Sequence, residues 1–161
     1  MNGGCECGLA YVADHPPDVR LHRGVHDSWA HGVKLSSLQS DRVVARVGEI
    51  EVLVVAPDAP LAQRHRAHLV GSNANKDTQY DIGVYSEYEG DERGYATHAF
   101  LARVDGRAVG LAIVRQRQEL WHTTWCEDGT PNPDAAALVS TAASRWTVDF
   151  AWIHRAHRRR A

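Results

Sequence analysis

The sequence predicts an α/β (α+β) fold, with a small N-terminal module followed by a mixed sheet that has flanking helices. The clearest observation is an antiparallel hairpin: HAFLARV (98–104) and RAVGLAIVRQR (107–117) flank Asp105-Gly106, a dipeptide typical of a two-residue type I′ turn. By contrast, the first residues of the chain are polar and rich in His and Gly. They therefore predict a separate module, residues 1–33, before the sheet-forming residues 34–161.

The N-terminal module contains residue types that are typical of a tetrahedral metal site. Asp18 offers an N-cap for a helix that runs to about His31. Two histidines on this helix are one turn apart, so both imidazole rings can reach one ion. Two thiols precede them, as in small zinc-binding modules. The candidate metal ligands are Cys5, Cys7, His22 and His26.

The spacing of the two cysteines leaves two interpretations open. Zinc-binding cysteine pairs usually have two or more residues between them, whereas only Glu6 separates Cys5 from Cys7. Neighbouring glycines permit a tighter turn, and Tyr11 and Trp29 supply aromatic bulk for a small core. The alternative is a helix with two surface histidines and a frayed, thiol-bearing terminus. The glycines concerned are Gly3, Gly4 and Gly8.

A second strand pair and a helix are predicted before the hairpin. Residues 42–47 (RVVARV) and 50–56 (IEVLVVA) are rich in valine, and Gly48-Glu49 separates them as a turn. A helix over 61–70 is entered through proline. We expect alternating hairpin residues to face this helix, namely Phe100, Ala102 and Val104.

The remaining segments predict loops and one further strand. Residues 71–95 and 127–134 are polar and rich in turn-forming residues. Residues 135–145 read as a weak helix or a linker, and WTVDFAWI (146–153) reads as a final strand. Gly110 inside the second hairpin strand predicts a bulge or a close backbone approach.

Composition excludes several classes of function. The chain has 161 residues, of which 43% are hydrophobic and 24% charged, and its formal net charge is -2. A charge so close to zero gives no global reason to expect a nucleic acid partner. No apolar run approaches the length of a membrane helix, so we expect no membrane partner. Three cysteines form a poor disulfide framework, and the start lacks a signal-peptide pattern, so we expect an intracellular, reducing setting.

The order of these features resembles the cohesion-establishment (ESCO-type) N-acetyltransferases of the GNAT superfamily. CG-x2-Y at Cys7, followed by H-x3-H at His22, resembles the zinc finger of that family. IEVLVVAPDAPLAQRHRAHLV is similar to its strand, turn and helix, and THAFLARVDGRAVGLAIVRQR to the central GNAT hairpin. FAWIHRAHRRR resembles the strand that leads into the coenzyme A loop, including a tryptophan at Trp152.

The resemblance implies zinc as a bound metal, acetyl-CoA as the acetyl donor and a protein lysine as the acceptor. Strand-end residues would pair with the pantetheine arm, and the arginines after them would meet phosphate. Asp149 would be the catalytic base, because it is the acidic residue of the final strand. Taken alone, the residues favour a core tryptophan, a solvated basic tail and an exposed carboxylate. The implied acetyl-CoA contacts are Ala151, Trp152, Ile153, Arg158, Arg159, Arg160 and Ala161.

One departure from the family pattern affects the expected activity. The family continues with R-x-x-G-x-G/A and a helix whose amides bind pyrophosphate, whereas Ala161 follows the arginines here. We therefore expect a C-terminally truncated, incomplete GNAT-like sheet, weak binding of acetyl-CoA and slow or absent acetyl transfer. An open sheet edge also predicts self-association. The alternative function is a noncatalytic zinc-binding interaction module on a residual acetyltransferase scaffold, and acetyl-CoA affinity separates the two.

Overall fold

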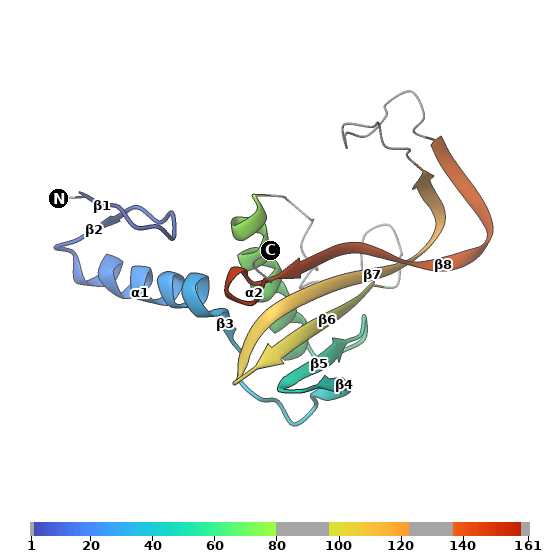
Figure 1. Ribbon diagram of the computed structural model, residues 1–161, viewed down its shortest axis with the longest axis horizontal. Helices are drawn as coiled ribbons and strands as arrows, with labels where there is room; N and C mark the ends of the chain where they lie inside the picture. Colours follow the sequence, from blue (N-terminus) through green and yellow to red (C-terminus); the bar gives the residue numbers. More distant parts are fainter. Residues whose placement is uncertain (1, 80–96, 123–136, 159–161) are drawn as a thin grey trace.

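The structure is a computed structural model, and it describes residues 2–79, 97–122 and 137–158. Within these ranges, two α-helices accompany a sheet (Figure 1), which confirms the predicted α+β fold class. No helix in these ranges combines the length and apolar character needed to cross a membrane. The elements are β1 (Asn2–Gly3), β2 (Tyr11–Val12), α1 (Pro16–His31), β3 (Val33–Lys34), β4 (Arg42–Val47), β5 (Ile50–Val55), α2 (Leu61–Thr78), β6 (Thr97–Val104), β7 (Arg107–His122) and β8 (Ala137–Ile153), followed by a 3-10 helix (Arg155–His157).

The main sheet has the strand order β3-β7-β6-β5-β4. The short β3 pairs with the first two residues of β7, and β8 pairs with β7 from Gly110 onwards. Every pairing between the described strands is antiparallel, so the parallel pairing of a mixed sheet is not seen among them. β1 and β2 form a separate hairpin that lies alongside α1 (Figure 1). The long β7 and β8 extend together away from the rest of the sheet.

The hydrophobic core lies between α2 and one face of the sheet. Val70 on α2 and Val55 on β5 are fully buried, and Leu53 and Leu101 are at most 1% exposed. Each such side chain contributes about 1.5–3 kcal/mol through the apolar surface that it removes from water. Trp152 of β8 joins the same cluster, so the last strand is packed onto the core as well as hydrogen-bonded to β7.

The predicted hairpin is confirmed. β6 and β7 pair up to Val104 and Arg107, which leaves a two-residue turn. The turn residues have positive φ, 47° at Asp105 and 71° at Gly106, as a type I′ turn requires.

The irregularity predicted at Gly110 is also present. The register of β6 and β7 shifts after Ala102, because Ala102 pairs with Gly110 and Arg103 pairs with Ala108. A Cβ atom on residue 110 would lie 3.1 Å from the Ala102 Cβ and 3.4 Å from the Trp152 carbonyl oxygen. Glycine therefore permits β6, β7 and β8 to approach one another closely at this point.

The face of β6 that packs on α2 differs from the prediction. Ala99 and Leu101 are buried, and they pair with the buried Val55 and Leu53 of β5. The segment HAFLARV is apolar on both faces, so an alternation of period two does not choose between them. The face of β6 that is buried is the one that continues the buried face of its neighbour, β5. The alternation alone predicted Phe100, Ala102 and Val104.

α1 begins earlier than predicted. Its N-cap is His15, and Pro16 and Pro17 occupy the first turn, where a missing N–H costs nothing. Asp18 therefore lies inside the first turn and not at the N-cap. Its carboxylate accepts hydrogen bonds from the His15 ring at 2.9 Å and from the Val12 N–H at 3.1 Å. These bonds hold the pKa of Asp18 below its usual value.

α2 is longer than predicted, because it continues eight residues beyond Val70 to Thr78. Gly71 and Ala74 are buried in this polar extension, and the Thr78 hydroxyl donates to the Ala74 carbonyl at 2.8 Å. Packing of this face against the sheet overrides a weak local helix propensity. The helix ends at Gln79, which has a left-handed φ of 55°.

β8 also exceeds its predicted bounds. It covers Ala137–Ile153, whereas the sequence predicts a weak helix or linker over 135–145. Pairing with β7 explains the difference, because β7 residues as far as His122 pair with β8 from Ala137 onwards. The predicted loop over 127–134, residues 80–95 of the other predicted loop, and Cys126 lie outside the described residues.

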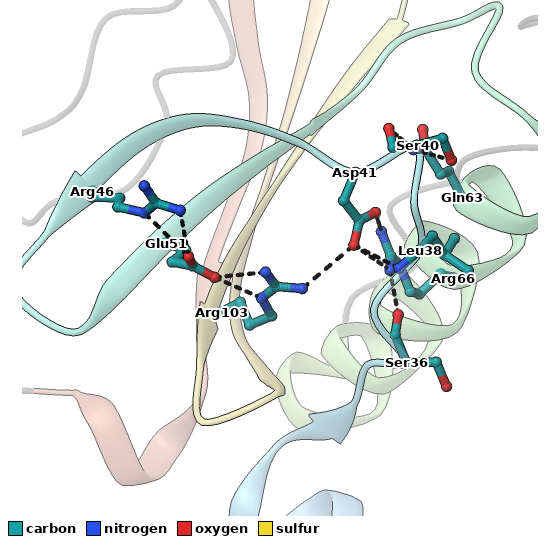
Figure 2. A network of polar contacts seen from close by, with 9 residues as sticks. All are labelled: Ser36, Leu38, Ser40, Asp41, Arg46, Glu51, Gln63, Arg66 and Arg103. Carbon is teal, nitrogen blue, oxygen red and sulfur yellow. Dashed lines mark hydrogen bonds and ion pairs between the residues drawn. The ribbon is translucent and has the colours of Figure 1, made fainter.

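A chain of ion pairs connects α2 to three strands and to the segment before β4 (Figure 2). Asp41 accepts hydrogen bonds from Arg66 of α2 and lies 3.4 Å from the Arg103 guanidinium of β6. Arg103 continues to Glu51 at 2.6 Å, and Glu51 also pairs with Arg46 at 3.1 Å. The Arg66 and Asp41 side chains are each 9% exposed, so these two charges are buried as a pair.

Candidate functional site

Four side chains near the N-terminal end bring their donor atoms together. The donor atoms of Cys5, Cys7, His22 and His26 all lie within 4.8 Å of one another. Bonds of about 2.0–2.3 Å to a tetrahedral zinc ion would place such atoms about 3.3–3.8 Å apart. The distance between the Cys5 Sγ and the His26 Nδ1 is 3.1 Å. The fold therefore assembles the predicted ligand set in a geometry that needs only small adjustments to hold a metal.

A tight turn overcomes the short cysteine spacing. The Gly8 N–H donates to the Cys5 carbonyl at 2.9 Å, which closes a four-residue turn containing both cysteines. Gly8 has a φ of 79°, in the left-handed region that glycine adopts without a steric penalty. Both sulfur atoms thus reach the same point.

The two histidines are held by aromatic neighbours. Tyr11 of β2 stacks on His22 with the ring centroids 4.0 Å apart, and Trp29 lies 5.5 Å from the ring of His26. The His22 Nε2 is buried and has no hydrogen-bond partner among the described residues. A buried nitrogen left without a partner is costly, and a bound metal ion would remove that cost. The donor set therefore fits a metal in its chemistry as well as in its distances.

The end of α1 contacts the segment that follows β8. The His154 Nε2 lies 2.9 Å from the Trp29 carbonyl, and the Ala156 N–H donates to the His154 Nδ1 at 3.2 Å. Nδ1 is thus the acceptor and Nε2 carries the hydrogen. Burial lowers the pKa of His154 below its usual value, although the hydrogen bond to Trp29 opposes this shift. The Arg155 guanidinium lies 4.2 Å from the centroid of the Trp29 ring.

The predicted pantetheine-binding residues lie at the end of β8. Ala151, Trp152 and Ile153 pair with β7, and within the described ranges no strand pairs with the other edge of β8. The Trp152 side chain is 3% exposed and packs in the core, as its residue type alone favours. Its Nε1 donates to the Asp77 carboxylate at 2.8 Å. Ile153 is 55% exposed.

Of the predicted phosphate-binding arginines, Arg158 is described. Its Nε donates to the Ile153 carbonyl at 2.8 Å, and its Nη2 forms an ion pair with Asp77. The Arg158 side chain is 48% exposed. Sequence reasoning did not identify Asp77, because the residue lies in a polar stretch that resembles a loop. Arg159, Arg160 and Ala161 lie outside the described residues.

Asp149, the predicted base, interrupts the register between β8 and β7 and points toward two arginines. Its Oδ2 accepts from Arg115 at 2.9 Å and from Arg117 at 2.5 Å. Its Oδ1 accepts from the Thr147 hydroxyl at 3.0 Å. The Asp149 side chain is 16% exposed, whereas the residue as a whole is exposed, as its residue type alone favours.

The fold is that of an acetyltransferase domain of known structure. The chain aligns with the acetyltransferase domain of xEco2 with a TM-score of 0.54 and 14% sequence identity, over 76% of this chain and 68% of that chain. The same domain bound to a K105-CoA conjugate aligns with a TM-score of 0.48 and 14% identity, over 75% of this chain and 68% of that chain. Neither a protein family nor a curated protein matches the sequence. The predicted ESCO-type resemblance is confirmed at the level of the fold, together with the Cys-Cys-His-His cluster.

Proposed function

We propose that this chain is a zinc-binding N-acetyltransferase that transfers an acetyl group from acetyl-CoA to an amine, with a protein lysine as the acceptor. One observation carries the proposal: the fold of the xEco2 acetyltransferase domain occurs together with a Cys-Cys-His-His cluster near the N-terminal end. The proposal divides the chain into a zinc-binding module, residues 1–33, and an acetyltransferase part, residues 34–161. It also includes self-association through the outer edge of β8.

Zinc would have a structural function in this protein. Four protein ligands close the tetrahedral shell and leave no position for water or substrate. The ion would hold the turn at Cys5–Gly8 against α1, which has no buried residue of its own to pack there. We therefore expect zinc to fold residues 2–26 and to take no part in acetyl transfer.

Acetyl-CoA would bind along the outer edge of β8. Backbone groups of Ala151 and Ile153 are proposed to pair with the amides of the pantetheine arm, as an added strand would. Arg158, whose side chain is 48% exposed, comes five residues after Ile153 and supplies positive charge for the phosphates. Arg159, Arg160 and Ala161 complete the proposed phosphate contacts.

Direct transfer requires an unprotonated amine. A lysine amine has a reference pKa of about 10.4, so a base must take a proton as nitrogen attacks the thioester carbonyl. A bond forms from nitrogen to the acetyl carbon, the bond from carbon to sulfur breaks, and the thiolate takes up a proton. Asp149 is the proposed base. Its Oδ1 contacts only the Thr147 hydroxyl among the described residues, and is the oxygen placed to accept the proton.

The contacts of Asp149 also favour a second candidate function. Arg115 and Arg117 both donate to its Oδ2, an arrangement typical of a structural ion pair. If the Asp149 carboxylate has only this structural function, the chain would be a noncatalytic zinc-binding interaction module on an acetyltransferase scaffold.

Three measurements on the full chain test the proposal. Metal analysis should give about one zinc ion per chain, and a His22→Ala/His26→Ala double variant should lose it. Calorimetric titration with acetyl-CoA and transfer to a lysine peptide should both be positive, even if weak. Asp149→Asn should lower transfer and leave acetyl-CoA affinity unchanged, whereas the exposed Asp58→Asn control should change neither. Zinc binding without any acetyl-CoA affinity would support the interaction module instead.

A further inference from the structure

Asp77 holds two groups that belong to the proposed acetyl-CoA site. It lies in the last turn of α2, and its side chain is 13% exposed. Its Oδ2 accepts the Trp152 indole N–H at 2.8 Å and also pairs with the Arg158 guanidinium. One carboxylate oxygen therefore connects the core-facing Trp152 side chain of β8 to Arg158, five residues beyond the end of the strand.

The position of Asp77 is unfavourable for a carboxylate unless these partners are present. The C-terminal end of a helix carries partial negative charge, which repels an acidic side chain in the last turn. Burial adds a desolvation cost. The helix does not need Asp77 in order to end, because Gln79 provides the left-handed residue that terminates it. The ion pair with Arg158 and the indole hydrogen bond offset both costs.

The same contacts fix the orientation of Arg158. A guanidinium group has five N–H donors. In Arg158, Nε–H is directed to the Ile153 carbonyl and one Nη2–H to Asp77, which leaves three N–H donors beyond those two bonds among the described residues. The side chain is 48% exposed, so the remaining donors are accessible to an anion. Anchoring at two points removes most of the rotamer freedom that an arginine would otherwise lose on binding.

We propose that Asp77 is a positioning residue, which orients Arg158 to receive a phosphate group at the end of β8. The inference rests on the proposed function, because the phosphate meant is the diphosphate of acetyl-CoA. Asp77 does not contact that ligand itself. It acts through Arg158, and through Trp152 it fixes the strand end from which Arg158 projects.

The test compares wild type with Asp77→Asn, which keeps the shape of the side chain and an oxygen that can accept from Trp152. The probes are CoA and inorganic pyrophosphate, titrated calorimetrically at about 0.15 M salt, where long-range attraction is screened. Asp58→Asn is the matched control, since it removes the same charge before the opposite end of α2. We expect Asp77→Asn to weaken both probes about two- to tenfold, the range that ordering one long side chain corresponds to. We expect Asp58→Asn to leave both affinities unchanged.

Two further measurements separate positioning from a general loss of structure. In an Arg158→Gln background, Asp77→Asn should have no additional effect on affinity, because the two residues act as one unit. The Arg158 Nη2–H resonance should be resolved in the wild type, because that group donates to Asp77, and should move toward the position of free arginine in Asp77→Asn.

The outcomes are distinguishable from those that test the proposed function. If wild type binds pyrophosphate but not CoA, the acetyl-CoA function is refuted, and the loss of pyrophosphate binding in Asp77→Asn still supports the positioning function. Tighter binding by Asp77→Asn would overturn the inference, because Asp77 would then compete with phosphate for Arg158. Equal responses of wild type and Asp77→Asn, including no response in either, would also overturn it.

Discussion

Arg107, the first residue of β7, donates hydrogen bonds of 3.0 Å to both carboxylate oxygens of Asp27 on α1. Asp27 directly follows His26, so this pair connects the sheet to the helix that carries both histidines of the Cys-Cys-His-His cluster. Arg107 also donates to the Gly32 carbonyl at 2.9 Å, where α1 ends. The hydrogen bonds from Arg107 to the carboxylate, with a smaller contribution from Lys34, hold the pKa of Asp27 below its usual value. This two-point contact at the hairpin turn is therefore one of the connections that hold the cluster relative to the sheet, together with those between Trp29 and the segment after β8.

Replacing Arg107 should loosen this junction. Arg107→Gln removes a two-bond ion pair and one bond to a carbonyl, and it should lower the free energy of unfolding by about 1–3 kcal/mol. Urea denaturation of the zinc-loaded chain measures the change. Arg46→Gln is the control: the Arg46 side chain is 69% exposed, and solvent screening should make its pair with Glu51 contribute less than the Arg107 contact. An equal decrease in the free energy of unfolding in the two variants would mean that the contact of Arg107 with Asp27 stabilises the fold no more than an exposed ion pair does.

Two glycines of the same region should respond to alanine in opposite directions. Gly32 has a φ of 88°, and a Cβ there would lie 2.5 Å from the Ala108 carbonyl oxygen. Gly32→Ala should therefore destabilise the protein by more than about 1 kcal/mol. Gly24 lies inside α1 with nothing within 4 Å of an added Cβ, so Gly24→Ala should stabilise by about 0.5–1 kcal/mol. Thermal unfolding measures the change in stability of both variants. A destabilising effect of Gly24→Ala would contradict the observed helix.

Local signals in the sequence were sufficient for much of the fold. The turn at Asp105-Gly106 and the metal-ligand candidates depend on residues close together in the chain, and the structure assembles them as predicted. The extension of α2 to Thr78 was not predictable in this way, because its residues are polar and its burial in the core through Ala74 depends on distant strands.

The same distinction applies to the candidate site. The turn that joins Cys5 to Gly8 could be anticipated from the neighbouring glycines. The partners of the other site residues come from distant segments: Asp77 and Arg158 are 81 positions apart, and Arg107 and Asp27 are 80 apart. No local pattern marks such pairs, since each residue alone reads as a solvated surface charge.

The tight turn predicts that the thiols of Cys5 and Cys7 contribute equally to zinc affinity. Cys5→Ser and Cys7→Ser should each lower zinc affinity by a similar factor, because both sulfur atoms lie in one four-residue turn facing His22 and His26. Competition with a chromophoric chelator measures both affinities. Cys126→Ser serves as the control and should leave zinc binding unchanged. Full affinity in Cys5→Ser would show that the first cysteine is not a ligand.

The buried pair of Asp41 and Arg66 predicts how stability depends on pH. Burial alone would raise the pKa of Asp41, but hydrogen bonds from Arg66 and from the Leu38 N–H hold it below its ordinary value of 3.8. A carboxylate whose pKa is lowered by folding stabilises the protein fully at pH values above the unfolded pKa. That contribution is lost as the pH falls through the folded pKa. The loss should therefore begin near pH 5, where the unfolded carboxylate starts to bind protons, and continue as the pH falls further.

Asp41→Asn should reveal this contribution directly. The variant leaves the Arg66 charge, on a side chain that is 9% exposed, without its carboxylate, and near neutral pH it should lower the free energy of unfolding by about 3–5 kcal/mol. Urea denaturation of wild type and variant from pH 7 downward gives the difference at each pH. The difference should stay constant to about pH 5 and then shrink, because the wild-type carboxylate becomes protonated. Any change at the Cys-Cys-His-His cluster as the pH falls affects both proteins alike and cancels. A difference that stays constant as the pH falls to about 3 would mean that the charge of Asp41 does not stabilise the fold.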